Sequence, residues 1–276
     1  MINKKETELK RGIQIEKFHT FFKIQFRNDY VFNGESHNFW EMVFVLDGSV
    51  GITADSDVYV LQKGQAIIHR PNEFHKIWSE FGTNPTVIVV SFTASVFPEI
   101  KGRLLSFDSI EADTLSKLCE KSYTCLKRDS IKFCNSGVIN MFESQKLMLE
   151  LELFIFSAAA RRGHESHIGM KSAEIYSAAV TLMENHIEEN YCIEDFADML
   201  NVSPPYLKKI FYKYSGAGVM KYYNRLKARI ACTYLDRGMS VKETASLLGF
   251  TDQNYFSTFF KRIIGMSPSE FKKHEH

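Results

Sequence analysis

Two histidines and a glutamate in the first third of the chain have spacings that could bring them into one polar cluster. Six residues separate the run His37-Asn-Phe-Trp-Glu41 from the turn residue Gly48, and His75 lies further along the same strand-rich region. Residues an even number of positions apart on a strand share a face, so His37 and Glu41 point to the same side and His75 can converge with them. Two imidazoles and a carboxylate would suit a divalent transition metal.

Two tryptophans lie close to these groups in the sequence. Trp40 directly precedes Glu41, and Trp78 follows His75 by three residues. An indole ring can stack on the face of a sugar, although in a strand it serves equally well as ordinary packing. His37, Trp40, Glu41, His75 and Trp78 are therefore our candidate contacts for a small-molecule effector.

The segments that must position these residues have the pattern of strands up to residue 93 and of helices beyond residue 109. Short apolar or alternating runs, separated by turn signals such as Asp47-Gly48 and Lys63-Gly64, are typical of a β-sandwich or small barrel. The runs are Phe21–Phe26, Phe39–Leu46, Val58–Leu61, Ala66–His69, Phe74–Trp78 and Val87–Phe92. A first helix is marked by Ile110, Leu115 and Leu118, and a second runs from Val138 to Ala160.

The second of these helices carries an apolar stripe that needs a partner. Leu147, Leu151, Phe154 and Ala158 fall on one face. Such a stripe is too apolar to remain exposed, so it packs either on the barrel or on a second copy of itself.

Composition excludes several classes of protein. Apolar residues make up 45% and charged residues 24% of the 276 residues, which fits a globular chain and not a disordered one. No apolar run approaches the roughly 18 residues of a membrane helix, and the charged N-terminus does not resemble a secretion signal. The five cysteines are odd in number and form no CxxC pair, which favours a reducing cytoplasm over a disulfide framework or a thiolate zinc site.

The net charge of +1 hides a strong separation of charge along the chain. Residues 203–276 contain 13 Lys and Arg against 5 Asp and Glu, a net +8, whereas residues 173–202 contain no base and 7 acids. A basic block of this size is typical of nucleic-acid binding, although a solvated basic face would look the same.

The basic region contains an internal repeat with the signals of two helix-turn-helix units. Ala197, Ser203, Tyr206, Leu207, Phe211 and Gly216 align with Ala245, Asp252, Tyr255, Phe256, Phe260 and Gly265 at offsets of 48 and then 49 residues. Each copy has an amphipathic helix, a tight turn (at Asn201 or Gly249), a capped second helix and a terminating glycine. A small residue in the first helix allows the second helix to pack closely across it. The apolar positions Leu207, Phe211, Phe256, Phe259 and Phe260 fit a core.

At this point the sequence resembles the AraC family of bacterial transcription regulators. The most specific string runs from Gly249-Phe250 through Tyr255-Phe256-Ser257 to Lys261-Arg262, and ends in Gly265-Met266-Ser267-Pro268. Residues about 173–275 resemble the family's DNA-binding domain throughout. Residues 20–93 resemble, less specifically, the cupin barrel that many members carry in front.

The resemblance implies an α+β chain of two domains. Residues 1–162 would form a cupin-like β-barrel with dimerisation helices, and 163–172 a linker. Residues 173–276 would form an all-α domain of seven helices, in which a linking helix at about Gly218–Arg237 joins two helix-turn-helix units. Twenty helical residues span about 30 Å, close to one turn of B-DNA, so both second helices can enter successive major grooves.

The resemblance also implies, residue by residue, which positions contact DNA. The first reading helix runs from about Ser203 to Tyr214 and the second from about Asp252 to Ile263. Gln253 and Asn254 suit adenine, because their amides can bond N6 and N7 together, while Lys208 and Lys209 suit guanine or phosphate. The full set of DNA-binding candidates is Ser203, Pro205, Tyr206, Lys208, Lys209, Thr251, Asp252, Gln253, Asn254, Ser257, Thr258 and Lys261. Other basic residues, including Lys227 and Lys272, are expected to be solvated or close to phosphate.

The cupin pattern is incomplete at two positions. Glu35 stands where the first histidine is usual, and Glu73 replaces a glycine between Pro71 and His75. We therefore expect no cofactor, and a metal at His37, Glu41 and His75 is disfavoured. With no catalytic motif elsewhere, an enzyme is also disfavoured.

The sequence thus predicts a cytoplasmic, ligand-responsive regulator, more in keeping with an activator, that functions as a homodimer. Its partners would be double-stranded promoter DNA, RNA polymerase and a small-molecule effector, with a sugar as one class, and no membrane. Two alternatives stay open: a metal-dependent cupin enzyme with an appended DNA-binding module, and an effector-independent stress regulator.

Overall fold

The computed structural model describes residues 10–100, 102–125, 128–129, 132–133, 141–159 and 171–274. Its strands form two antiparallel sheets, in the orders β8-β5-β2-β7-β1-β10-β9 and β4-β3-β6. The strands are β1 (Gln14–Gln25), β2 (Trp40–Asp47), β3 (Ser49–Ala54), β4 (Asp57–Gln62), β5 (Gln65–His69), β6 (His75–Ser79), β7 (Thr86–Val96), β8 (Leu104–Ser106), β9 (Arg128–Asp129) and β10 (Lys132–Phe133).

The two sheets enclose one core, and the larger sheet carries a second core on its outer face. Along β2, Val43 and Val45 point between the sheets, whereas Met42 and Phe44 pack on the outer side. This alternation is the period of two that any strand imposes. Glu41, two positions before Val43, is therefore directed to the inside of the barrel, where the polar cluster was expected.

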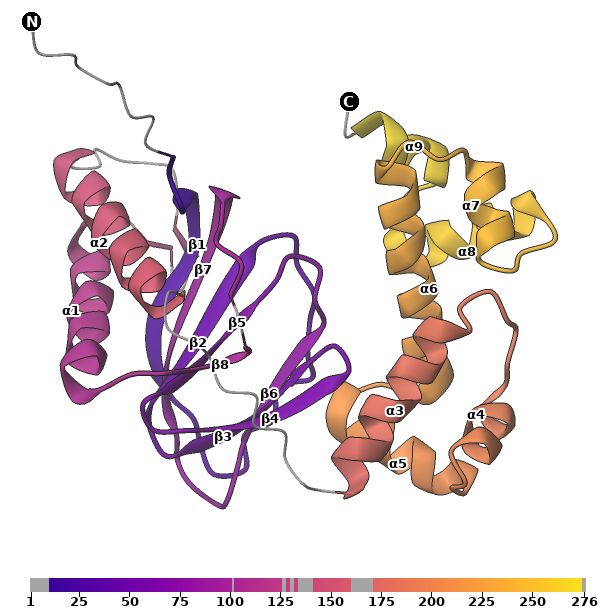
Figure 1. Cartoon of the computed structure of the whole chain (residues 1–276), viewed down its shortest axis with the longest axis horizontal. Helices are drawn as coiled ribbons and strands as arrows, with labels where there is room; N and C mark the ends of the chain where they lie inside the picture. Colours follow the sequence, from indigo (N-terminus) through magenta and orange to yellow (C-terminus); the bar gives the residue numbers. More distant parts are fainter. Residues whose placement is uncertain are drawn as a thin grey trace, which may run out of the picture.

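Helices α1 (Ser109–Cys125) and α2 (Met141–Ala159) cover the outer face of the larger sheet (Figure 1). Leu147, Leu151, Phe154 and Ala158 are all buried there, in one cluster with residues of β1, β2 and β7. Of the two alternatives for this stripe, packing on the barrel is confirmed. Packing of these four residues on a second copy is wrong.

The C-terminal part is helical from Lys171 onward, and its seven described helices confirm the sequence prediction. They are α3 (Lys171–Asn185), α4 (Ile193–Met199), α5 (Pro204–Ser215), α6 (Val219–Asp236), α7 (Val241–Leu247), α8 (Gln253–Ile264) and α9 (Pro268–His274). The predicted linker 163–172 lies mostly outside the described residues, and its last two residues already belong to α3. Helix α6, predicted as Gly218–Arg237, begins after Gly218 and ends before Arg237.

Strands β3, β8, β9 and β10 were missed in the sequence, β3 because of its glycine and the others because they are short. Strand β3 follows Gly48 at once and contains Gly51, a residue that weakens a strand pattern. Gly51 is needed there because the Trp78 ring lies against it, where an added Cβ would be 2.0 Å from the indole. Strand β8 has only three residues, too few for a period to show.

The two domains share a core. Val58, Phe74 and Trp78 of the barrel belong to the same buried cluster as the helical residues from Ala173 to Phe260. In Figure 1, α3 and α5 lie beside the β3–β4–β6 sheet, while α7 and α8 lie at the far end of α6. Within the described residues, none of the helices combines the length and apolar character needed to cross a bilayer.

Candidate nucleic-acid interface and effector site

The first helix-turn-helix unit consists of α4, a tight turn and α5. Asn201 has a φ of +52°, in the left-handed region that asparagine tolerates, and the amide of Val202 donates to the carbonyl of Ala197 at 3.0 Å. The Ser203 hydroxyl accepts from the amide of Tyr206 at 3.4 Å, which caps α5. The turn and cap predicted from the sequence are confirmed.

The second unit, formed by α7 and α8, repeats this geometry. The amide of Phe250 donates to the carbonyl of Ala245 at 2.9 Å, and the carboxylate of Asp252 accepts from the amide of Asn254 at 2.7 Å. Gly249 has a φ of +77°, and a Cβ there would lie 1.6 Å from the carbonyl oxygen of Glu188. Glycine is therefore required at this turn, both by conformation and by the close approach of the neighbouring chain.

The residues that we assigned to DNA reading lie on the outer faces of α5 and α8. Gln253, Asn254, Thr258 and Lys261 are exposed, and Ser257 is half-buried. In the first unit Pro205, Tyr206, Lys208 and Lys209 are exposed, as is Thr251 in the second turn. The hydroxyls of Ser257 and Thr258 donate to backbone carbonyls one turn earlier, at 2.9 and 3.0 Å, so they reach a partner only as acceptors.

The opposite faces of these helices form the core, as predicted. Leu207, Phe211, Phe256 and Phe260 are completely buried, and Phe259 is 5% exposed. Each reading helix is thus held by its apolar face and presents its polar face outward.

Two lysines donate hydrogen bonds to backbone carbonyls within the helical domain. Lys227 on α6 is 3% exposed, and its Nζ donates to the carbonyls of Glu189 at 2.8 Å and Leu248 at 3.0 Å. Burial lowers the pKa of this ammonium to about 8. Lys272 donates to the carbonyl of Met239 at 2.8 Å, just after α6. The prediction that Lys227 is solvated or near phosphate is wrong, because loop carbonyls far away in sequence surround its ammonium. Lys272 is half-buried, so the same prediction for Lys272 is not contradicted.

Inside the barrel, His37, Glu41 and His75 come together as predicted. Glu41 Oε2 lies 3.6 Å from His37 Nε2, and Glu41 Oε1 lies 3.3 Å from His75 Nε2. Burial alone raises the pKa of Glu41, but the two imidazoles outweigh it and hold the pKa at about 2. The same contact keeps the pKa of His75 above its ordinary value, although burial opposes it. Glu41 is therefore an anion in the barrel.

A second polar group, missed in the sequence, lies next to this one. Glu73 accepts from His69 Nδ1 at 3.1 Å and from Arg103 Nη2 at 2.6 Å. The rings of His69 and His75 stack with centroids 4.4 Å apart. No spacing pattern links Arg103 to Glu73, because the pair forms only when β8 closes the sheet edge.

The two tryptophans lie apart from the cluster. Trp40 faces the outer side of β2, stacks on Phe97 at 4.0 Å and lines, with Arg70 and Arg103, a cavity of about 360 Å³. Trp78 packs toward the helical domain, with its ring 6.0 Å from that of Tyr214 on α5. Neither indole joins His37, Glu41 and His75.

The barrel contacts the helical domain, on the linking helix α6 and on α5, through charged residues. Arg229 of α6 forms an ion pair with Asp55 at the β3–β4 turn and donates to the carbonyl of Asn72 at 3.2 Å. Lys76 on β6 donates to the carbonyls of Tyr212 and Lys213, at 3.2 and 2.6 Å, in the last turn of α5. Lys76 directly follows His75, so one strand contacts both the buried cluster and the first reading helix.

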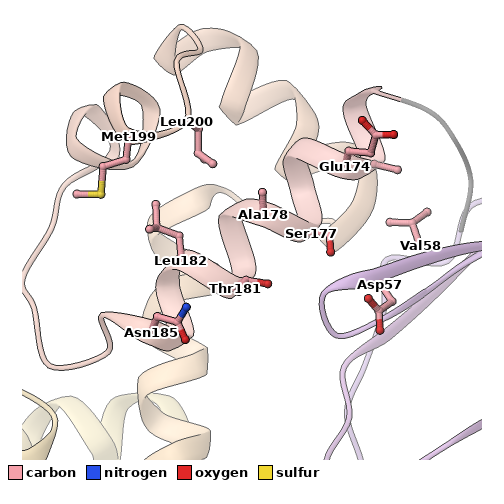
Figure 2. A pocket seen from close by; sticks show the side chains of 11 residues that line it. Asp57, Val58, Glu174, Ser177, Ala178, Thr181, Leu182, Asn185, Met199 and Leu200 are labelled. Carbon is pink, nitrogen blue, oxygen red and sulfur yellow. The ribbon is translucent and has the colours of Figure 1, made fainter.

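A groove of about 630 Å³ lies at this contact between the domains. Figure 2 shows Asp57 and Val58 of β4 on one side, with α3 residues such as Ser177 and Leu182 opposite and Met199 near the end of α4. Its lining contains none of the five residues that we predicted for effector binding.

Two helix-turn-helix units on one linking helix, attached to a barrel with a buried polar cluster, define a protein that joins a double DNA-binding unit to a ligand-binding domain. The comparisons with known families agree: residues 21–133 match the AraC-like ligand binding domain, and residues 196–274 match a helix-turn-helix domain. The chain belongs to the AraC family of transcription regulators.

Three curated relatives are similar to parts of this chain. An uncharacterized HTH-type transcriptional regulator of Escherichia coli, YijO, is 31% identical and covers 39% of this chain and 40% of its own length. The raffinose operon transcriptional regulatory protein RafR of Pediococcus pentosaceus is 30% identical over 39% of each chain. The Msm operon regulatory protein of Streptococcus mutans is 34% identical over 52% of each chain. The chain thus spans about half, or less, of the length of these relatives.

Proposed function

We propose that this chain is a sequence-specific, DNA-binding transcription regulator controlled by a small-molecule effector. The observation that carries the proposal is the pair of capped helices, α5 and α8, whose exposed faces carry the predicted reading residues. Helix α6 separates the two units by 18 residues, a length of about 27 Å that approaches one helical turn of B-DNA. The Lys227 ammonium donates to the carbonyl of Glu189, which precedes the first unit, and to that of Leu248, in the second unit. These two hydrogen bonds favour a fixed distance between the units.

The effector is proposed to enter the barrel at the cluster of His37, Glu41 and His75, where the chain offers a buried anion and two imidazoles. A sugar is our first class, in line with the operon that names the relative RafR. A thermal-shift screen of the purified chain against sugars and small acids tests this. A shift with one class, lost in Glu41→Gln, supports it, and no shift with any of them favours an effector-independent regulator.

As a regulator, the chain would bind double-stranded promoter DNA in the cytoplasm and contact RNA polymerase as an activator. Transcription from the bound promoter, measured with and without the chain, distinguishes activation from repression. A promoter that binds the chain and gives less transcript with it than without it would exclude the activator role.

Truncation of the two amides on α8 tests the reading of bases. Gln253→Ala or Asn254→Ala is expected to weaken binding to the cognate site by about 1–3 kcal/mol and to change binding to non-specific DNA little, because each amide would bond one base pair. Lys261→Ala is the matched comparison: if it contacts phosphate, it weakens binding to all sequences alike and lowers the salt slope by about one. A titration against operator variants measures both effects. If both amide variants keep wild-type specificity while folded, α8 does not read bases through them.

A second apolar stripe on α2 suits a homodimer. Leu149, Leu153 and Phe156 are 46%, 67% and 44% exposed, and they follow one another at helical spacing on the face away from the barrel. We propose that this stripe, in place of the buried one, meets its copy in a second chain. Both faces of α2 are apolar, so the sequence alone does not tell which one packs inside.

Leu153→Glu is therefore expected to convert a dimer into a folded monomer at micromolar concentration, as light scattering would show, because the charge would be buried at the contact. Gln62→Glu, which adds the same charge at the exposed end of β4, is expected to leave the dimer intact. Leu151→Glu, on the buried stripe, should instead destabilise the barrel. A wild-type chain that scatters as a monomer would contradict the dimer.

A further inference from the structure

The two histidines of the barrel cluster have fixed tautomers. His37 Nδ1 lies 3.0 Å from the carbonyl oxygen of Phe39, and His75 Nδ1 lies 3.1 Å from the carbonyl oxygen of Glu73. A carbonyl oxygen can only accept, so Nδ1 carries the hydrogen in both rings. In the neutral rings, the inward-facing Nε2 atoms therefore present lone pairs.

These lone pairs face a carboxylate, which is also an acceptor. The Nε2 atoms of His37 and His75 are buried without a hydrogen-bond partner, at 3.6 and 3.3 Å from the oxygens of Glu41. A proton on His75 would satisfy one contact, but 3.6 Å is too long for a hydrogen bond from His37. A metal cation between these groups would bind both Nε2 lone pairs and the Glu41 carboxylate at once.

Glu35 adds a fourth donor. One oxygen of its carboxylate, one ring nitrogen of His37 and one ring nitrogen of His75 lie within 4.8 Å of one another. Two backbone hydrogen bonds of 3.0 Å between Glu35 and His75 hold these residues side by side. At the position where the cupin pattern expects a histidine, the chain thus replaces one ligand type by another and does not lose the ligand.

The other departure from the cupin pattern also removes no ligand. The Glu73 carboxylate is directed to His69 and Arg103, while the Glu73 carbonyl orients the ring of His75. A carbonyl that fixes the ring of a metal-binding histidine is a common outer-shell arrangement. The sequence argued against a metal because it showed two missing positions, and the structure gives each of them a use.

We propose that His37, His75, Glu41 and Glu35 bind one divalent first-row transition ion. With metal–ligand bonds of about 2.0–2.2 Å, neighbouring ligand atoms in a tetrahedral site lie about 3.3–3.6 Å apart. Each imidazole nitrogen lies at about this spacing from a different Glu41 oxygen: His75 Nε2 is 3.3 Å from Oε1, and His37 Nε2 is 3.6 Å from Oε2. Imidazoles mixed with carboxylates suit Zn²⁺, Co²⁺, Fe²⁺ or Mn²⁺, whereas Mg²⁺ and Ca²⁺ prefer oxygen ligands alone. This site uses the three residues at which we propose that the effector enters the barrel, so the ion would form part of the effector site, but reading DNA does not require it.

Titration of the full-length chain with Co²⁺, after treatment with a chelator and dialysis, tests the site. We expect one equivalent to bind with a visible d–d absorption band, Zn²⁺ to displace it and Mg²⁺ to have no effect. His37→Gln and His75→Gln should weaken binding by at least about 100-fold, the upper end of what changes to outer-shell partners cost. Glu35→Gln changes an exposed side chain, so it should weaken binding while the metal-free chain melts as the wild type does. His186→Gln, in the helical domain, is the matched control and should bind Co²⁺ normally.

Two results would overturn the proposal: no saturable Co²⁺ binding by the wild-type chain, or wild-type affinity in both His75→Gln and Glu35→Gln. Promoter binding is measured on the same samples. A chain that binds DNA but not Co²⁺ refutes the metal site and leaves the regulator proposal standing, whereas the reverse pattern refutes only the regulator.

Discussion

Phe256→Ala is expected to cost about 3–5 kcal/mol and to unfold the second helix-turn-helix unit, the usual effect of removing a buried phenylalanine. Phe256 is completely buried on the inner face of α8, and its ring lies 5.3 Å from that of Phe250 and 5.9 Å from that of Phe260. The loss should be visible without DNA.

Tyr255→Ala is the matched control for this prediction. Tyr255 is the preceding aromatic residue but is 63% exposed, so its truncation should change stability by no more than about 0.5 kcal/mol. Urea unfolding and amide hydrogen exchange over α7 and α8 would measure both variants, because the loss can be confined to one unit. Equal stabilities of the two variants would show that Phe256 does not hold α8 in place.

The helical domain could be predicted in detail because its signals are local. Ser203 and Asp252 cap their helices, and Asn201 and Gly249 have positive φ values in the turns. Each of these residues interacts with residues only a few positions away, so its role can be predicted from the local sequence alone. The alignment of the two repeats is confirmed down to a shared turn hydrogen bond, at Val202 and at Phe250.

The features that the sequence could not show depend on residues far apart in the chain. Lys227 appeared solvated because its acceptors are two loop carbonyls, at Glu189 and Leu248. Arg103 reaches Glu73 only across the folded sheet. Periodicity finds an apolar face, but it does not tell whether that face packs on its own chain or on another.

The barrel site could be predicted only in part, because it too depends on residues far apart in the chain. His37 and Glu41 are an even number of positions apart, so the sequence predicts them on one side of a strand, and the structure places His75 with them. Parity does not fix distances across a barrel, so the sequence could not show that Glu35 lies close to both histidines. Trp78 follows His75 by three positions, which is an odd number, and it faces the helical domain instead.

The contact between the two domains joins residues 174 positions apart. The Asp55 carboxylate pairs with Arg229 and also accepts from the amide of Phe74 at 3.0 Å, while the Asp55 carbonyl accepts from Tyr176 at 3.1 Å. Glu184 lies 4.0 Å from the same guanidinium. Arg229 thus meets two carboxylates at the place where the barrel touches α3 and α6.

Arg229→Glu is expected to separate the domains, since it places a third carboxylate against Asp55 and Glu184. Breaking a buried pair costs about 3–5 kcal/mol, and because the Arg229 side chain is 27% exposed we expect the lower part of that range. Small-angle scattering should show a larger radius of gyration, and amide exchange at the β3–β4 turn should become faster. Arg225→Glu makes the same charge change at an exposed position of α6, and it should alter neither the radius of gyration nor the amide exchange at the β3–β4 turn.

If Arg229→Glu matches Arg225→Glu in both measurements, Arg229 does not hold the domains together. If the domains do separate, Lys76 loses the carbonyls of Tyr212 and Lys213, and the last turn of α5 is released from the strand that carries His75. DNA affinity in the separated variant then measures how far the docked barrel restrains the first reading helix. Because β6 touches both the buried cluster and α5, an effect there would give the barrel a physical route to the DNA-binding unit.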